Sequence, residues 1–160
     1  MKLTRQKFVQ ADCRVLLAGV VLLLASPAVF ACTCLPHAGE PIQKVVAKAR
    51  NESRAVFSGT VVAIDRKPGD LSVAVRFEVE KFWKGALKKE VTVFTGIGGG
   101  DCGYVFEVGQ RYLVYAYTHN ETGLGTNICQ RTASLIDAAK DLKALGKGKL
   151  VRTRSQKKLQ

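Results

Sequence analysis

Four stretches of the chain are rich in β-branched and aromatic residues, or alternate apolar and polar residues, as β-strands do. The pattern is clearest from Val73 to Glu80, where Arg76 and Glu78 separate the apolar residues of one face. A turn at 67–70 separates the first two stretches. The predicted strands, together with a shorter fifth one, cover residues 55–64, 71–83, 91–95, 111–118 and 126–129.

Two other segments repeat apolar residues at three- and four-residue spacing, which indicates helices. The first covers residues 42–50 and follows Pro41, which suits a first helical turn. The second is expected to begin with Ser134 as its N-cap and to end at Gly146. Short antiparallel strands between two helices predict a mainly β fold with two short helices. The element count fits the five-stranded Greek-key barrel known as the OB-fold.

The first 31 residues have the three-part layout of a secretory signal peptide. Basic residues precede an apolar run at 15–25, and Val29 and Ala31 occupy the usual cleavage positions. We therefore expect cleavage after Ala31, so that Cys32 begins the mature chain. The alternative is an uncleaved membrane anchor, but the apolar run is shorter than the roughly 20 residues that span a bilayer.

Basic residues outnumber acidic ones by 25 to 13, and the excess is concentrated near the C-terminus. Between Lys140 and Lys158 only Asp141 opposes a run of lysines and arginines. We expect residues 32–146 to form the domain and residues 147–160 to be a disordered, solvated tail. Contact of this tail with an acidic surface or anionic lipid is the alternative. Nucleic acid is not expected as the partner of a secreted chain.

Four of the five cysteines remain once Cys13 leaves with the signal peptide, and an even number in an oxidising compartment predicts disulfides. Four cysteines allow three pairings, of which Cys32 with Cys34 is disfavoured because it closes a small strained ring. In an extended segment side chains alternate between faces, so Cys32 and Cys34 should point one way and Thr33 the other. If both cysteines are bridged inward, Thr33 projects outward from a rigid terminus.

Other candidate chemistry is weaker. The glycine-rich loop at 96–103 precedes no helix, so it predicts a disulfide-anchored surface loop rather than a phosphate site. His37 and His119 lack the spacing of metal ligands and are expected in exposed loops. No pair of carboxylates suggests catalysis, so we predict no enzyme activity. A redox dithiol or a four-thiolate zinc site stays open as an alternative that titration of free thiols would test.

Several short segments follow one another in a specific order. A Cys-x-Cys tip with a nearby proline comes first, then a strand, a second strand ending in Lys-Gly, a Cys-Gly-Tyr motif and a further strand. They are residues 32–37, 55–59, 77–85, 102–104 and 111–114, followed by Cys129. This order resembles the N-terminal domain of the tissue inhibitors of metalloproteinases, within the wider netrin-like group. The resemblance covers residues 32–145 and is closest to compact single-domain relatives of the bacterial type.

The resemblance implies a netrin-like OB-fold barrel with disulfides Cys32–Cys102 and Cys34–Cys129. It also implies an inhibitor with no cofactor of its own, located outside the cell or in the periplasm, whose partner is a secreted zinc metalloproteinase. The α-amine and carbonyl of Cys32 would chelate the zinc of that protease, and Thr33 would enter its specificity pocket. The protease-binding residues that the resemblance implies are Cys32, Thr33, Cys34, Leu35, Pro36, Asp101 and Cys102.

The chain departs from this family in two respects. No cysteines remain for the third disulfide of the animal inhibitors, and glycines replace the residues before Cys102 that contact the protease. One alternative is a netrin-like module that binds a different partner outside the cell or in the periplasm, because a fold does not fix a function. Another is a lipoprotein, in which acylation would consume the sulfur of Cys32 and cap its amine. Cys102 would then lose its disulfide partner, so simple cleavage is preferred.

Overall fold

The computed structural model describes residues 32–34, 39–66, 68–85, 88–121 and 123–151. The predicted signal peptide, Leu35, Pro36, His37 and the last nine residues lie outside this described part. None of the helices within the described ranges has the length and apolar character needed to cross a membrane.

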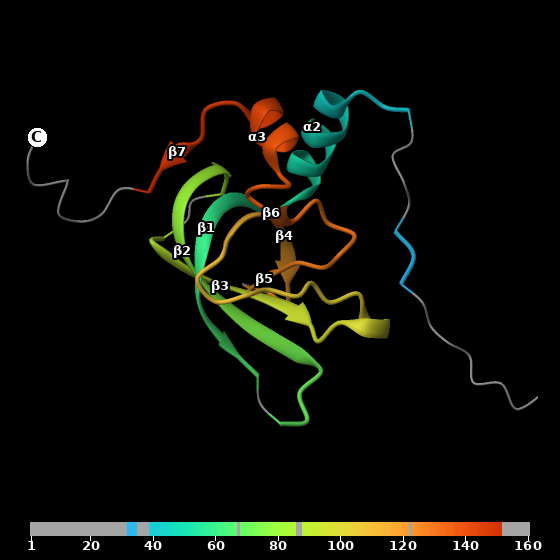
Figure 1. Cartoon of the computed structure of the whole chain (residues 1–160), viewed down its shortest axis with the longest axis vertical. Helices are drawn as coiled ribbons and strands as arrows, with labels where there is room; N and C mark the ends of the chain where they lie inside the picture. The colour runs from blue at the N-terminus through green and yellow to red at the C-terminus, as the bar shows by residue number, and fades with distance from the viewer. Residues whose placement is uncertain (1–31, 35–38, 67, 86–87, 122, 152–160) are drawn as a thin grey trace, which may run out of the picture. The chain divides into compact units, whose positions relative to one another are not determined.

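Five strands form a closed barrel (Figure 1). They are β1 (Ala55–Asp65), β2 (Ser72–Lys84), β3 (Glu90–Gly96), β4 (Arg111–His119) and β5 (Gly123–Gly125). β1 pairs with β2, β2 with β3, β3 with β5 and β5 with β4, and the pairing of β4 with β1 closes the ring. The β3–β5 pairing is parallel and the other four are antiparallel. The predicted mainly β fold with an OB-fold-like barrel is therefore confirmed.

Closure of the barrel depends on strong coiling of β1 against β2. Their register shifts after Val56, after Ser58 and after Val61, and such irregularities bend a strand and increase its twist. At Gly59 the strands approach so closely that an added Cβ would stand 2.6 Å from the carbonyl oxygen of Glu78. Residues 56–60 of β1 pair with β2 along one edge and with β4 along the other, so β1 joins the two ends of the strand order.

Aromatic rings fill the barrel interior. Phe77 lies edge-on to Phe57, Phe106 and Tyr112, with ring centroids 5.5, 5.3 and 6.5 Å away. Aromatic quadrupoles favour this edge-to-face geometry. Phe57 and Phe77 are fully buried. Since burial of large apolar side chains is the main favourable contribution to folding, this cluster is central to the stability of the barrel.

Two helices, α2 (Ile42–Glu52) and α3 (Ala139–Leu145), lie side by side against the barrel (Figure 1). They cover a second apolar cluster, to which β4 contributes Leu113 and Tyr115. Residues 112–116 of β4 are consequently all buried, some facing the barrel interior and the others facing this cluster. This explains why the central part of β4 has no polar face.

The fifth strand lies earlier in the sequence than predicted, at 123–125 instead of 126–129. Two of its three residues are glycine, so it carries no alternating apolar pattern that could reveal it. Gly125 packs against the ring of Tyr117, where an added Cβ would stand 2.7 Å from the nearest ring carbon. The segment at 126–129 instead leaves the barrel and enters a turn.

The second helix is shorter than predicted and begins at Ala139. Its expected N-cap, Ser134, belongs instead to β6 (Ala133–Ser134), which pairs with β4. The hydroxyl of Ser134 accepts the backbone N–H of Asp137 and so holds a turn that precedes the helix. Ile136, expected on an apolar helix face, is 88% exposed. The prediction failed because apolar residues of this turn happen to continue the helical spacing.

Part of the expected disordered tail is ordered. β7 (Lys149–Leu150) pairs with β2, so the prediction of disorder from residue 147 is wrong as far as residue 151. Gly146 ends α3 as predicted, with φ 68°. Its carbonyl oxygen accepts the indole N–H of Trp83 at 2.9 Å, and this bond fixes the chain where it returns toward β2.

Candidate functional site

Two disulfides attach the first described residues to the barrel. Cys32 is bonded to Cys102 and Cys34 to Cys129, with Cα–Cα distances of 5.4 and 5.1 Å. This is the pairing that the resemblance implies, and it is one of the two that the spacing of the cysteines left open. Disulfides persist in oxidising compartments, so these bonds are compatible with an extracellular or periplasmic location.

Thr33 lies between the two bridged cysteines and is exposed, whereas both cysteines are half-buried. The side chains therefore alternate as an extended segment requires. We call residues 32–34 the tethered tip. Leu35 and Pro36 would continue the predicted protease-binding surface, but they lie outside the described residues.

The loop that carries Cys102 is held by the carboxylate of Asp101. Its oxygens accept the backbone N–H of Ile97 at 2.7 Å and those of Gly98 and Gly103 at 2.9 Å. These hydrogen bonds, that of Gly103 most strongly, lower the pKa of Asp101 below its ordinary value of 3.8. The carboxylate of Asp101 is thus occupied by hydrogen bonds within the loop. Asp101 therefore fixes the backbone conformation of the loop that lies beside the tip.

The backbone of this loop adopts conformations that favour glycine. Cys102 itself has a left-handed conformation, with φ 60°, which directs the chain sharply past the disulfide. Gly103 is buried against the backbone of Gly96, where an added Cβ would collide with the Gly96 carbonyl group. The glycine-rich segment is therefore a tightly packed disulfide-anchored loop, in agreement with the prediction.

A second loop carries Cys129 and contacts the first. The side-chain oxygen of Asn127 accepts the backbone N–H groups of Cys129 at 2.9 Å and Gln130 at 3.1 Å, which fixes the turn. The backbone N–H of Ile128 donates to the carbonyl oxygen of Cys102 at 2.9 Å. The side chain of Ile128 is 46% exposed beside the disulfides. Sequence reasoning missed Asn127 and Ile128 because it assigned this segment to a strand.

A partly buried ion pair connects the second loop to α3. Arg131 donates two hydrogen bonds to the carboxylate of Asp141 on α3, at 2.8 and 2.6 Å. The hydroxyl of Tyr115 donates to the same carboxylate at 3.0 Å. Burial, followed by the negative charge of Asp141, raises the pKa of Tyr115. Asp141, which the sequence presents as the one acidic residue in a basic run, therefore links α3 to the segment that carries Cys129.

The cysteine sulfurs are close enough together to suggest a metal site. The Sγ atoms of Cys32, Cys102 and Cys129 all lie within 4.8 Å of one another. Each of them is nevertheless part of a disulfide, and zinc binding requires the thiolate form. The arrangement therefore favours structural bridges over the four-thiolate zinc site and over a reduced dithiol.

His119 differs from its predicted setting. It ends β4, is half-buried and stacks on the ring of Phe94, with centroids 5.0 Å apart. The expectation of an exposed loop was wrong because β4 extends one residue further than its apolar pattern. His37 lies outside the described residues.

Taken together, the fold and the site define a class: an OB-fold-like barrel whose extended tip is attached to two neighbouring loops by separate disulfides. No protein-family model matches this chain, and no curated protein sequence is significantly similar to it.

Proposed function

We propose that this protein inhibits zinc metalloproteinases and that the α-amine and carbonyl oxygen of Cys32 chelate the zinc of the target. The observation that carries the proposal is the tethered tip. Two cysteines are bonded to two different loops, and the intervening Thr33 is exposed. A terminus held in this way is presented as a rigid projection.

Chelation follows from the chemistry of an N-terminal residue. A catalytic zinc keeps one coordination position open for water or substrate. The amine nitrogen and carbonyl oxygen of Cys32 would close a five-membered ring on the metal and displace that water. The disulfide to Cys102 already orders this residue, so less conformational freedom is lost on binding. The sulfur takes no part, because it is bonded to Cys102.

The surroundings of the tip suit an interface with a protease. Thr33 would enter the pocket beside the zinc, and Leu35 and Pro36 would follow Cys34 along the cleft. Cys102 and its loop would form one neighbouring edge. Ile128 would add an apolar contact on the other loop, since its side chain is partly exposed next to the disulfides.

The proposal requires export and cleavage after Ala31, because any residue before Cys32 would block its amine. The predicted signal peptide and the two disulfides both support secretion or transport to the periplasm. An acylated Cys32 would be incompatible with both the amine and the Cys32–Cys102 bond.

The test compares a chain that begins at Cys32 with one that carries a single extra alanine before it, against a panel of secreted zinc metalloproteinases. We expect the first to inhibit at least one protease and the extended form to lose roughly a hundredfold in affinity. Matching unfolding temperatures and an absence of free thiols in both proteins would exclude misfolding. Equal inhibition by both would overturn the chelation mechanism, and no inhibition by either would favour a binding module with another partner.

A further inference from the structure

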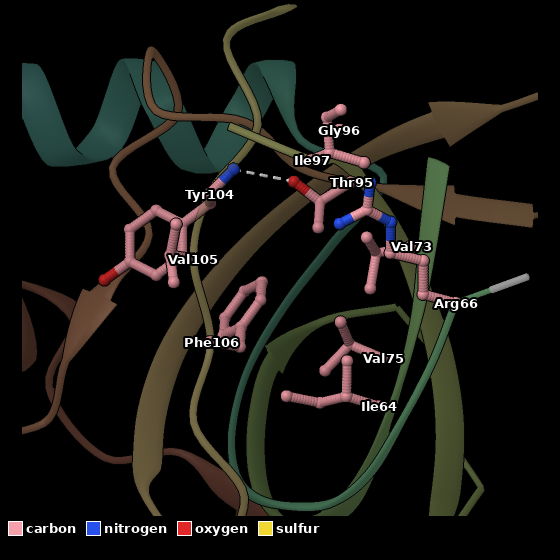
Figure 2. Close-up of a pocket in the computed structure, with 10 residues that line it drawn as sticks. All are labelled: Ile64, Arg66, Val73, Val75, Thr95, Gly96, Ile97, Tyr104, Val105 and Phe106. Atoms are coloured by element: carbon pink, nitrogen blue, oxygen red, sulfur yellow. Dashed lines mark hydrogen bonds between the residues drawn. The ribbon is translucent and has the colours of Figure 1, made fainter. Parts of the chain in front are cut away.

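One end of the barrel is open and holds an apolar cavity of about 190 Å³, at the place where β1 ends, β2 begins and β3 ends (Figure 2). Its floor includes Val75 and Phe106, which are buried. Ile64 and Val73 are half-buried along its walls. Nothing in the proposed inhibitory function uses this cavity.

The polar groups around the cavity are largely satisfied by the protein itself. The hydroxyl of Thr95 lines the cavity and accepts the backbone N–H of Tyr104 at 2.8 Å, as Figure 2 shows. Asp101 lies behind Gly96, but its carboxylate oxygens already accept three backbone N–H groups. The interior therefore offers apolar contact and no free acceptor from these two side chains.

Arg66 is the exception at the rim. Among the ten described residues that line the cavity, it is the one charged side chain, and none of the ten is acidic. Figure 2 shows its guanidinium group turned toward Val73 and Thr95. Arg66 is exposed and has no hydrogen bond or ion pair with any residue that the structure describes. A planar guanidinium group with free N–H donors matches a carboxylate, which it can bind through two parallel hydrogen bonds.

We propose that this end of the barrel binds a small apolar carboxylate, with its hydrocarbon part in the cavity and its carboxylate on Arg66. The size is suitable, because a dry apolar cavity of about 150 Å³ accommodates benzene. A single aromatic ring or a short branched chain would thus fill the space between Val75 and Phe106. Discrimination between charged and neutral ligands of the same shape would come from Arg66. The cavity takes no part in zinc chelation by Cys32. A failure of ligand binding at the cavity would therefore leave the inhibitor proposal untouched, and the converse also holds.

The probe is 3-phenylpropionate, titrated into the mature chain while backbone amide resonances are followed by NMR. We expect saturable shifts confined to residues at the cavity, including Gly96, Ile97 and Val105, with a dissociation constant in the low millimolar range. The neutral analogue 3-phenylpropanol should bind about fivefold more weakly, because it lacks the ion pair. Equal affinity for the two compounds, or shifts scattered over the surface, would overturn the proposal.

Two substitutions separate charge from shape. Arg66→Gln should weaken binding of 3-phenylpropionate about fivefold and leave that of 3-phenylpropanol unchanged. Arg76→Gln is the matched control, since Arg76 is an exposed arginine of β2 outside the cavity, and it should change neither affinity. Val73→Phe should fill the cavity and abolish binding of both compounds. Binding that is unaffected by Arg66→Gln, or weakened equally by Arg76→Gln, would contradict the assignment.

Discussion

The backbone N–H of Ile128 donates a hydrogen bond to the carbonyl oxygen of Cys102 at 2.9 Å. This bond joins the two loops to which the tip is attached, because Cys102 binds Cys32 and the neighbour of Ile128, Cys129, binds Cys34. The two disulfides therefore hold the tip against one connected unit. A force on the tip is resisted by both loops together, which is the property that a rigid inhibitory terminus needs.

Removal of one bridge should cost stability as well as tip order. Replacement of both Cys34 and Cys129 by serine opens a link between residues 95 positions apart. The loop-entropy model predicts a loss of about 4 kcal/mol in the free energy of unfolding. Urea denaturation of the variant and the parent measures this difference. An unchanged free energy of unfolding would mean that the bridge does not constrain the unfolded chain.

Asp101→Asn should destabilise the loop beside the tip, because the charged acceptor of three backbone N–H groups is replaced by a neutral amide. The pKa of Asp101 is lowered in the folded state. Its stabilising contribution is therefore complete above the ordinary value of 3.8 and is lost as the pH falls through the lower folded value. The difference in unfolding temperature between parent and variant should accordingly be largest near neutral pH and vanish in strong acid.

Asp70→Asn is the control for this experiment, since Asp70 is an exposed acid in the connection between β1 and β2. It should leave the unfolding temperature almost unchanged at all pH values. A pH-independent effect of Asp101→Asn, or an equal effect of Asp70→Asn, would contradict the role assigned to the Asp101 carboxylate.

Asp141→Ala should lower the free energy of unfolding by about 3 kcal/mol, because it leaves the Arg131 charge and the Tyr115 hydroxyl without their shared acceptor. Lys140→Ala, an exposed neighbour on α3, should change it very little. Combining Asp141→Ala with Arg131→Met should be less damaging than the sum of the single changes, since the uncompensated charge is also removed. Strict additivity in this cycle would show that the pair is not coupled.

Inhibition should strengthen as the pH rises through the range in which an α-amine loses its proton. Only the neutral amine of Cys32 can bind zinc, and the ordinary pKa of such a group is about 7.7–8.0. Below that range the inhibition constant should rise about tenfold per pH unit. A small-molecule zinc chelator assayed on the same protease corrects for the pH dependence of the enzyme. A flat profile after this correction would argue against the amine as a ligand.

Much of the barrel could be predicted from the sequence, because β1 to β4 are long enough to show an apolar pattern. β5 could not, since a three-residue strand containing Gly123 and Gly125 has no side-chain period. β7 could not either. Lys149 and Leu150 show no strand pattern of their own. They form a strand because they pair with β2.

The tip was predictable for a similar reason: alternation alone places Thr33 opposite the two cysteines. The contacts that hold the two loops beside the tip could not be predicted from the sequence. Asp101 acts through backbone N–H groups that converge only once the loop has folded. Asp141 meets Arg131 and Tyr115 through contacts between α3, the second loop and β4, which no local pattern reveals. The density of glycines before Cys102 was the available sign that this loop is tightly packed.

Zinc chelation depends most directly on the chemical state of Cys32 in the mature protein. Peptide mapping by mass spectrometry, with fragmentation between Cys32 and Cys34, determines both the terminus and the partner of each cysteine. We predict an unmodified amine on Cys32, a Cys32–Cys102 bond and a Cys34–Cys129 bond. A chain that begins before Cys32, a lipid on Cys32, or a free thiol at Cys102 would contradict the proposal.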